Sequence, residues 1–265
     1  MKKIGFIGAG NMGGALAAAV AKSDNTVYVS DACREKAEAL AVEISAAASS
    51  TAEIIENCDI VFLGVKPQIL PALAKEIAAL VAKRGKAICL VSMAAGVTLS
   101  TLSELFEGAK IIRIMPNTPA SVGAGVILYA LGKKATDGDE ALLCESLAHA
   151  GSLNKLDERL IDAATAVSGC GPAFAYMFIE ALADGGVKCG LPRDKAQKFA
   201  AEMLLGASKL CLGSEKHPGE LKDAVCSPGG STIAGVAALE DGAFRASVID
   251  AVEASYKRTK ELSKG

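Results

Sequence analysis

Three glycines near the amino terminus have the spacing of a loop that holds the pyrophosphate of a dinucleotide. The segment Gly8-Ala9-Gly10-Asn11-Met12-Gly13 is a G-x-G-x-x-G pattern that follows an apolar strand-like run and opens a helix-like one. Gly8 permits a tight turn, Gly10 lets the backbone approach a phosphate, and Gly13 lets the helix pack on the strand. An ordinary glycine-rich turn has the same letters, but this strand-to-helix context favours dinucleotide binding.

The residues after the second apolar run bear on the choice between NADH and NADPH. Ser30 and Asp31 close that run, and Asp31 lies 18 residues beyond Gly13. An acidic residue at this distance typically bonds the adenosine ribose hydroxyls and repels a 2′-phosphate, which favours NADH. Ser30 and Arg34 could hold a phosphate instead, and Asp31 could simply cap the helix that begins after it. The sequence therefore leaves NADPH or NADH open as the cofactor.

Three later strand ends are predicted to face the same ligand, because open α/β sheets bind ligands beyond the carboxyl ends of their strands. They belong to the segments 65–67, 92–96 and 115–119. Lys66 would serve equally well as a solvated surface charge. The cofactor contacts expected at these ends are Val65, Lys66, Pro67, Met93, Ala94, Ala95 and Asn117.

The elements that must position these residues alternate between strand and helix. This order predicts an α/β fold over residues 1–156, an N-terminal Rossmann-like domain with a parallel sheet and helices on both faces. We expect strands at 3–8, 26–30, 59–65, 87–92 and 111–115, with an edge strand at 125–131, and helices at 11–21, 34–43 and 70–83.

Strand signals stop after Leu156, and residues 157–265 are predicted to form an all-helical dimerisation and substrate-binding domain. Pro172, Pro192 and Pro218 each mark a helix start, since proline is tolerated in the first helical turn. The helix after Pro172 is apolar around much of its circumference and needs cover on several sides. We therefore expect a homodimer through this domain, which can assemble further into a larger homo-oligomer.

Composition argues against several classes of partner. The net charge of -2 gives no electrostatic case for nucleic acid or an anionic membrane. No apolar run approaches the roughly 20 residues that a membrane span needs, and the first residues lead directly into a strand. Eight cysteines without a C-x-x-C pair, and only two histidines, predict no metal site. We expect a cytoplasmic protein that acts on a small molecule.

Motifs in both halves of the chain form one ordered set. They are the segments 7–13, 65–67, 94–97, 115–119, Ser168-Gly169-Cys170-Gly171-Pro172-Ala173-Phe174, 217–223 and Val225-Cys226-Ser227-Pro228-Gly229-Gly230-Ser231-Thr232-Ile233. Together they resemble one family, pyrroline-5-carboxylate reductase, in order over nearly the whole chain and most specifically in the carboxy-terminal half. The resemblance implies an NAD(P)H-dependent oxidoreductase that reduces the C=N bond of L-1-pyrroline-5-carboxylate to give L-proline, the last step of proline biosynthesis.

The same resemblance implies the substrate site. The loop at residues 227–232, supplied by the same protomer or by its partner, would hold the substrate carboxylate, and the Thr232 hydroxyl would lie near the ring nitrogen as the catalytic group. The substrate-binding residues so implied are Ser168, Gly229, Gly230, Ser231, Thr232, Glu158 and Glu215. From physical chemistry alone, Ser231 and Thr232 could equally cap the helix that follows. Cys170 and Phe174 depart from the family's usual Ser and Tyr.

Two alternatives belong to other classes. A β-hydroxyacid dehydrogenase also begins with a glycine loop and ends in helices, but it needs a lysine on the helix after the second glycine motif. That helix reads Phe174-Ala175-Tyr176-Met177-Phe178-Ile179, without lysine. A non-catalytic nucleotide sensor would need the glycine loop and a dimer surface, but it gives no reason for the second loop at 229–232.

Overall fold

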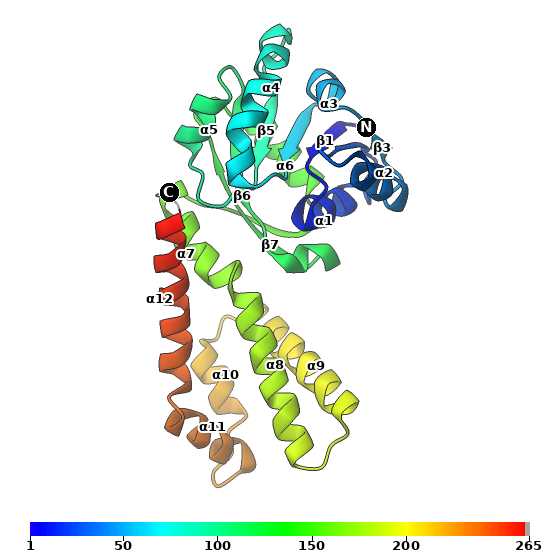
Figure 1. Ribbon diagram of the computed structural model, residues 1–265. Helices are drawn as coiled ribbons and strands as arrows, with labels where there is room; N and C mark the ends of the chain where they lie inside the picture. Colours follow the sequence, from blue (N-terminus) through cyan, green and yellow to red (C-terminus); the bar gives the residue numbers. More distant parts are fainter. Residues whose placement is uncertain (263–265) are drawn as a thin grey trace. The chain divides into compact units, whose positions relative to one another are not determined.

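The computed structural model describes residues 1–262 and contains an eight-stranded sheet in the order β3-β2-β1-β4-β5-β6-β7-β8 (Figure 1). Neighbouring strands from β3 to β6 pair in parallel, β7 runs antiparallel to β6, and β8 is parallel to β7. The strands are β1 (Lys3–Ile7), β2 (Thr26–Ser30), β3 (Ala47–Ala48), β4 (Ile60–Leu63), β5 (Cys89–Ser92), β6 (Lys110–Met115), β7 (Gly125–Leu131) and β8 (Gly151–Lys155).

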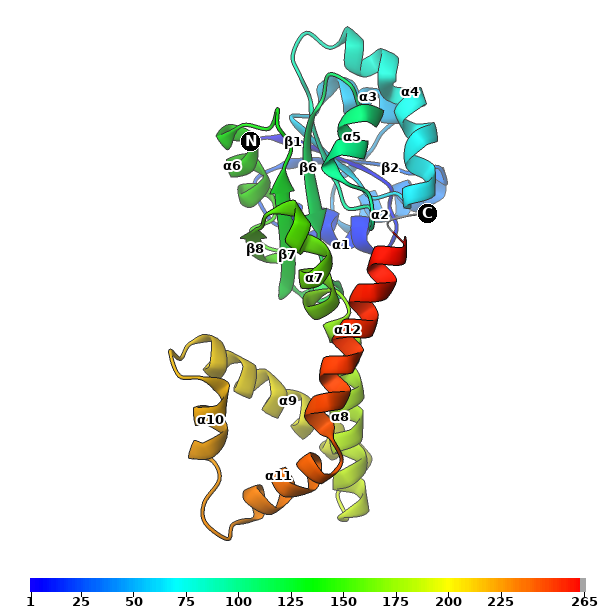
Figure 2. The same cartoon turned by 90° about the vertical axis from the view of Figure 1, so that its left-hand side faces the viewer.

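Helices cover both faces of the sheet, because its central strands are apolar on both sides. One buried cluster joins the sheet to α1 (Asn11–Val20), α2 (Arg34–Glu43) and α6 (Asp137–Ser146), with the rings of Phe6 and Phe62 stacked at 4.7 Å. The other joins it to α3 (Thr51–Asn57), α4 (Leu70–Lys83) and α5 (Leu99–Leu105). Figure 2 shows α4 and α6 on opposite sides of the sheet. The predicted α/β fold is confirmed.

The predicted edge strand at 125–131 is a strand, but it does not lie at the edge. β8 pairs beyond it and takes that position. Gly151 adopts a left-handed φ of 141°, and a Cβ there would collide with the backbone of Gly125. The two strands therefore approach closely at a point where only glycine fits.

Contacts divide the chain into two compact units. Unit 1 contains residues 1–170 and the end of the last helix from Ser255, and unit 2 contains residues 171–254. The boundary predicted at 156/157 precedes α7 (Glu158–Ser168), whereas the compact units separate after it, because Ile161 of α7 packs under β6 and β7. The functional boundary at 156/157 stays a prediction.

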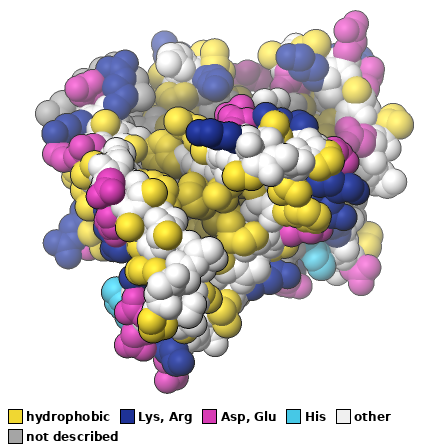
Figure 3. Space-filling view, turned by 90° about the horizontal axis from the view of Figure 1, so that it is seen from below, with side chains coloured by type: hydrophobic (Ala, Val, Ile, Leu, Met, Phe, Trp, Pro, Cys, Tyr) yellow, Lys and Arg dark blue, Asp and Glu magenta, His cyan; other side chains and the backbone are white. Residues whose placement is uncertain are grey.

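Unit 2 is helical, and each proline named above stands at or beside a helix start. Its helices are α8 (Gly171–Lys188), α9 (Arg193–Leu212), α10 (Pro218–Ala224), α11 (Ser231–Asp241) and the first part of α12 (Phe244–Leu262). Large apolar side chains stay exposed on these helices, including Tyr176 and Met177. Figure 3 shows hydrophobic side chains gathered at the surface, with charged side chains around them.

One helical stretch has the length and hydropathy of a membrane span. It is Glu158–Lys188, the single such stretch among the described residues, with a mean hydropathy of 1.3. Charged residues interrupt it, so no charge-free run reaches the roughly 20 residues of a membrane span. A helix that another protein surface covers on several sides has the same apolar character.

Candidate functional site

The glycine loop after β1 has the close contacts that its spacing predicts. Gly8 has a φ of 109°, and its N–H donates to the carbonyl oxygen of Ser30 at 2.7 Å. A Cβ on Gly8 would lie 2.6 Å from the Gly64 carbonyl oxygen, and one on Gly13 would collide with the Gly8 carbonyl oxygen. Gly10 differs, since a Cβ there would meet nothing within 4 Å. Gly8 and Gly13 therefore serve packing, and the open space beside Gly10 is available to a ligand.

Helix α1 begins at this loop without a side-chain cap. Its N-cap residue is Gly10, with φ and ψ of -72° and 178°, and no side chain bonds the first turn. Uncapped N–H groups at a helix start carry partial positive charge and bind phosphate. A cavity of about 350 Å³ includes Ala9, Gly10 and Asn11 in its lining and continues along α1 to Leu40 and Glu43 of α2. The residues present therefore fit the pyrophosphate of a dinucleotide.

The other predicted cofactor residues lie where the fold requires, at the carboxyl ends of neighbouring strands. The strand order reverses between β1 and β4, which is where such sheets bind ligands. Segment 65–67 follows β4, segment 93–95 follows β5 and Asn117 follows β6. Lys66 and Ala95 are exposed, whereas Ala94 is buried with its N–H bonded to the Ser92 hydroxyl at 3.3 Å.

The amide of Asn117 already has two partners within unit 1. It is 6% exposed, its Oδ1 accepts a hydrogen bond from the N–H of Val126 at 2.8 Å, and its Nδ2 donates to the carbonyl oxygen of Ser168 at 2.8 Å. The side chain thus ties the end of β6 to β7 and to the end of α7. Ser168 itself donates its hydroxyl to the Ala164 carbonyl oxygen at 3.0 Å.

Asp31 is joined to the glycine loop and does not cap α2. Its Oδ2 accepts a hydrogen bond from the N–H of Ala9 at 2.7 Å, and its Oδ1 accepts one from the N–H of Cys33 at 2.9 Å. The N-cap of α2 is Cys33, without a side-chain cap. Ser30 is buried and its hydroxyl lies 3.1 Å from that of Thr51. The carboxylate is therefore fixed beside the glycine loop.

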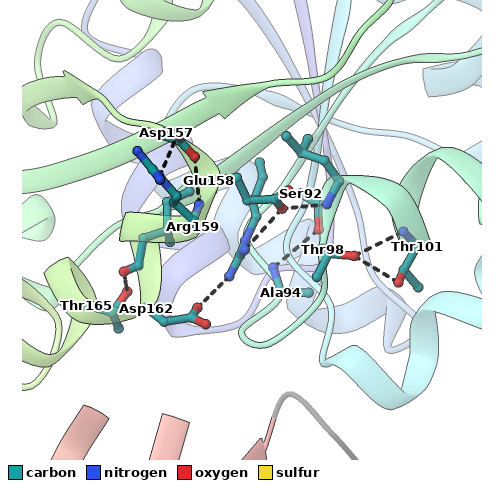
Figure 4. A network of polar contacts seen from close by, with 12 residues as sticks. Ser92, Ala94, Thr98, Thr101, Asp157, Glu158, Arg159, Asp162 and Thr165 are labelled. Carbon is teal, nitrogen blue, oxygen red and sulfur yellow. Dashed lines mark hydrogen bonds and ion pairs between the residues drawn. The ribbon is translucent and has the colours of Figure 1, made fainter. Parts of the chain in front are cut away.

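Glu158 is part of an ion network in unit 1 (Figure 4). Its Oε1 accepts hydrogen bonds from the N–H of Leu99 at 2.6 Å and from Arg113 at 3.2 Å. Arg113 also reaches Asp162 at 3.1 Å, and Asp162 lies 3.3 Å from Lys260. Sequence reasoning missed Arg113, although a lone arginine in the apolar strand Lys110–Met115 signals a buried ion pair.

The carboxy-terminal loop repeats the geometry of the amino-terminal one. Helix α11 has Gly230 as its N-cap, with φ and ψ of -77° and 169° and no side-chain cap. Gly229 has a φ of 67°, and a Cβ on Gly230 would collide with the Ser227 hydroxyl. Ser231 and Thr232 open the helix with exposed side chains. Their hydroxyls do not cap α11, so that alternative is wrong.

The remaining implied residues are less constrained. Glu215 is exposed in the segment between α9 and α10, near His217, whose Nδ1 accepts from the N–H of Gly219 at 3.0 Å. Cys170 and Cys226 are half-buried free thiols. In residues 1–262 no group of three or more His, Cys, Asp or Glu side chains is placed to hold a metal ion.

Comparison with known proteins assigns the family. A family profile described as pyrroline-5-carboxylate reductase dimerisation matches residues 158–262, and one described as NADP oxidoreductase coenzyme F420-dependent matches residues 3–96. A pyrroline-5-carboxylate reductase of Arabidopsis thaliana is 42% identical over 98% of this chain and 95% of that protein. The chain belongs to the pyrroline-5-carboxylate reductase family. Membership confirms the predicted class of this reductase, an NAD(P)H-dependent oxidoreductase that acts on a C=N bond.

Solved structures agree with the fold of this reductase. A pyrroline-5-carboxylate reductase from Coxiella burnetii aligns with a TM-score of 0.91 at 28% identity, over 100% of this chain and 99% of that one. The Plasmodium falciparum pyrroline carboxylate reductase with NADP bound aligns with a TM-score of 0.87 at 31% identity, over 99% and 98%. The dimerisation segment indicates that this reductase forms homo-oligomers.

Proposed function

We propose that this reductase delivers hydride to the C=N bond of L-1-pyrroline-5-carboxylate and so completes the synthesis of L-proline. The observation that carries the proposal is a repeated one: α1 and α11 each begin at a glycine N-cap without a side-chain cap. Each offers free N–H groups and partial positive charge to an anion. The first would take the dinucleotide pyrophosphate and the second the substrate carboxylate.

The chemistry demands little of the protein beyond binding and orientation. The nicotinamide supplies the hydride when it is bound, and the imine carbon accepts it most readily once the ring nitrogen is protonated. The backbone N–H groups of Gly230 to Thr232 would hold the carboxylate, and the Thr232 hydroxyl would hydrogen-bond the ring nitrogen. Fixing both ligands in contact geometry lowers the barrier by removing the entropic cost of their encounter. The roles of Ser168, Glu158 and Glu215 toward substrate remain expectations.

One assay separates this proposal from its rivals. Purified protein is given pyrroline-5-carboxylate with NADH or with NADPH, and loss of absorbance of the reduced cofactor is followed beside formation of proline. We expect rapid turnover, and no oxidation of β-hydroxyacids by NAD or NADP. Tight dinucleotide binding without proline formation would favour a sensor, and turnover of hydroxyacids would favour a dehydrogenase.

We further propose that unit 2 forms the homodimer. Met177 on α8 is 69% exposed and Tyr176 is 60% exposed, and further large apolar side chains of unit 2, such as Phe199 and Ile249, are exposed as well. Exposed apolar side chains in such number are typical of a surface that another protein covers. A partner copy that covered α8 would also account for the apolar character of Glu158–Lys188, so we expect a cytoplasmic homodimer that needs no membrane. Recovery in the supernatant after high-speed centrifugation without detergent tests the last point.

A charge in that patch tests the dimer. Met177→Glu should lower the mass in sedimentation equilibrium to that of a monomer or weaken association strongly, because an unpaired charge is costly in an apolar interface. Val42→Glu is the matched control, since Val42 is 83% exposed on α2 in unit 1 and should leave the mass unchanged. An unaltered mass for the Met177 variant would place the dimer contact elsewhere.

A further inference from the structure

We infer that the pocket at the end of β2 selects NADH over NADPH, with Asp31 as the main determinant. The inference rests on the proposed role of the glycine loop in binding a dinucleotide. A cavity of about 400 Å³ opens here, and its lining includes Ser30, Asp31, Arg34, Glu38 and Glu53. In a sheet of this topology, the acidic residue that ends the second strand lies beside the adenosine ribose, where NADPH carries its additional phosphate.

The Asp31 carboxylate is held in place by two backbone donors. One is the N–H of Ala9, inside the glycine loop, and the other is the N–H of Cys33, at the start of α2. Turning the carboxylate away to admit a phosphate would leave the partly buried N–H of Ala9 without its partner, which is costly, and would also break the exposed bond from Cys33. The negative charge is therefore a fixed part of the pocket.

The other charged groups reinforce the exclusion of phosphate. The pocket lining carries three carboxylates, on Asp31, Glu38 and Glu53, against one guanidinium, on Arg34. The Nε of Arg34 pairs with Glu38 at 2.7 Å, and the Arg34 side chain is 90% exposed. Arg34 and Glu38 therefore largely cancel each other and are screened by solvent, so the carboxylates that repel a phosphate are those of Asp31 and Glu53.

The hydroxyl groups of the pocket are also engaged. Ser49 and Ser50 both donate to Oε2 of Glu53, at 2.8 and 2.9 Å. The backbone bond from Ser50, with these hydroxyl bonds, lowers the pKa of Glu53 below its ordinary value, so this carboxylate stays ionised near neutral pH. The hydroxyl of Ser30 is hydrogen-bonded to that of Thr51. Few donors remain for a phosphate, whereas a ribose hydroxyl can donate to Asp31.

Kinetics with both cofactors test the inference. With saturating pyrroline-5-carboxylate, kcat/KM for NADH should exceed that for NADPH by about tenfold or more, since a tenfold preference corresponds to only about 1.4 kcal/mol. Asp31→Ser should raise the NADPH-to-NADH ratio of kcat/KM by about tenfold, mainly through a lower KM for NADPH. Glu53→Gln should raise it less. Glu56→Gln, on the same helix but outside the pocket, should leave the ratio unchanged.

A variant of Arg34 tests the opposite hypothesis, that this guanidinium binds the additional phosphate of NADPH. Arg34→Ala should leave the ratio within about twofold of the original, because this guanidinium holds no phosphate in our scheme. Inhibition by ADP and by adenosine 2′,5′-bisphosphate measures binding at the adenosine part of the site independently of hydride transfer. ADP should inhibit more strongly. Preference for NADPH, or a selective loss of NADPH use in Arg34→Ala, would overturn the inference while leaving the reductase assignment intact. Consumption of neither cofactor would instead overturn the proposed function and the inference with it.

Discussion

Arg113 in β6 and Asp162 in α7 form a buried ion pair, with 3.1 Å between Nη2 and Oδ1. Arg113 is 3% exposed, and its Nε has no hydrogen-bond partner among the described residues. The pair, with Glu158, attaches the first turns of α7 to the sheet. Glu158 also accepts a hydrogen bond from the N–H of Leu99, so this one carboxylate positions both α7 and the start of α5.

Breaking this pair should destabilise unit 1 strongly. Arg113→Ala leaves the carboxylates of Glu158 and Asp162 without their shared cation, and we expect a loss of about 3–5 kcal/mol in the free energy of unfolding. Denaturant titration measures it. Arg159→Ala is the control, because Arg159 is 80% exposed in its pair with Asp157 and should cost at most about 1 kcal/mol. Equal losses in the two variants would contradict a structural role for the network.

Gly10→Ala should separate dinucleotide binding from folding. The added methyl meets no protein atom and the backbone has an ordinary φ. The entropy that alanine removes from the unfolded chain offsets its weaker preference for the N-cap position, so the melting temperature should change little. The methyl would, however, occupy the space that a pyrophosphate needs, and we expect the affinity for both cofactors to fall by about tenfold or more. Calorimetric titration measures this. Gly85→Ala, also in open space, should bind normally.

Thr232→Ala should reduce kcat by about tenfold to a thousandfold, the scale of one lost transition-state contact. Thr232→Ser keeps a hydroxyl at the same position and should recover most of the activity. Because Thr232 is exposed and makes no capping bond, neither change should alter the melting temperature by more than a degree or two. Unchanged kinetics in the alanine variant would remove Thr232 from the mechanism.

The buried thiols should be unreactive across the pH range in which the protein is handled. Burial raises the pKa of Cys58 and of Cys89 to about 12, so both remain protonated thiols, and the thiol is not the nucleophile. Cys33 is exposed and should react with iodoacetamide at pH 8. Peptide mass spectrometry identifies the labelled sites. Labelling of Cys58 as fast as Cys33 in the native protein would show that this part of the core opens readily.

Asp139 should contribute to stability only above acidic pH. Burial raises the pKa of its carboxyl, but hydrogen bonds from Thr136 and Lys110 outweigh that effect and leave the pKa below its ordinary value. The contribution is therefore complete above the ordinary pKa of about 4 and is lost as the pH falls through the lower native pKa. Asp139→Asn should cost about 1 kcal/mol at pH 7 and progressively less below pH ~4.

Urea titrations at a series of pH values measure this difference. Glu145→Gln, on the exposed part of the same helix, should show no such convergence with the original protein. A penalty for Asp139→Asn that stayed constant down to acidic pH would show that the lost interaction is not that of the charged carboxylate.

The sequence predicts the elements whose signals are local. Continuous apolar runs locate the central strands, and Pro172, Pro192 and Pro218 locate helix starts to within a residue. The edge strand β8 escapes prediction because Gly151–Lys155 has neither an apolar run nor a clear alternation. Its place depends on the pairing with β7, a contact between segments distant in sequence. Helix α3 also escapes prediction, although Ser50 and Glu53 form a capping box, a local signal from which its start could be predicted.

The candidate site likewise contains residues that local sequence signals predict and residues that only the folded chain brings together. The glycine loop, Asp31 and the strand ends follow from spacing and from general rules about open sheets. The carboxy-terminal loop is found only by resemblance, because nothing in Gly229–Thr232 distinguishes an anion site from a helix cap by composition. Arg113 escapes because its partners lie 45 and 49 residues away along the chain. The double engagement of Asn117 is likewise a property of the folded chain.

The uncapped starts of α1 and α11 have a consequence for how such a protein changes over generations. Their bonding capacity resides in main-chain N–H groups, which every amino acid except proline carries. Side chains at Asn11 and Ser231 are thus comparatively open to exchange, while the turns that aim the backbone depend on glycine at Gly8 and Gly229. We therefore expect the backbone conformation of these two turns to limit sequence change more strictly than the side chains that line them.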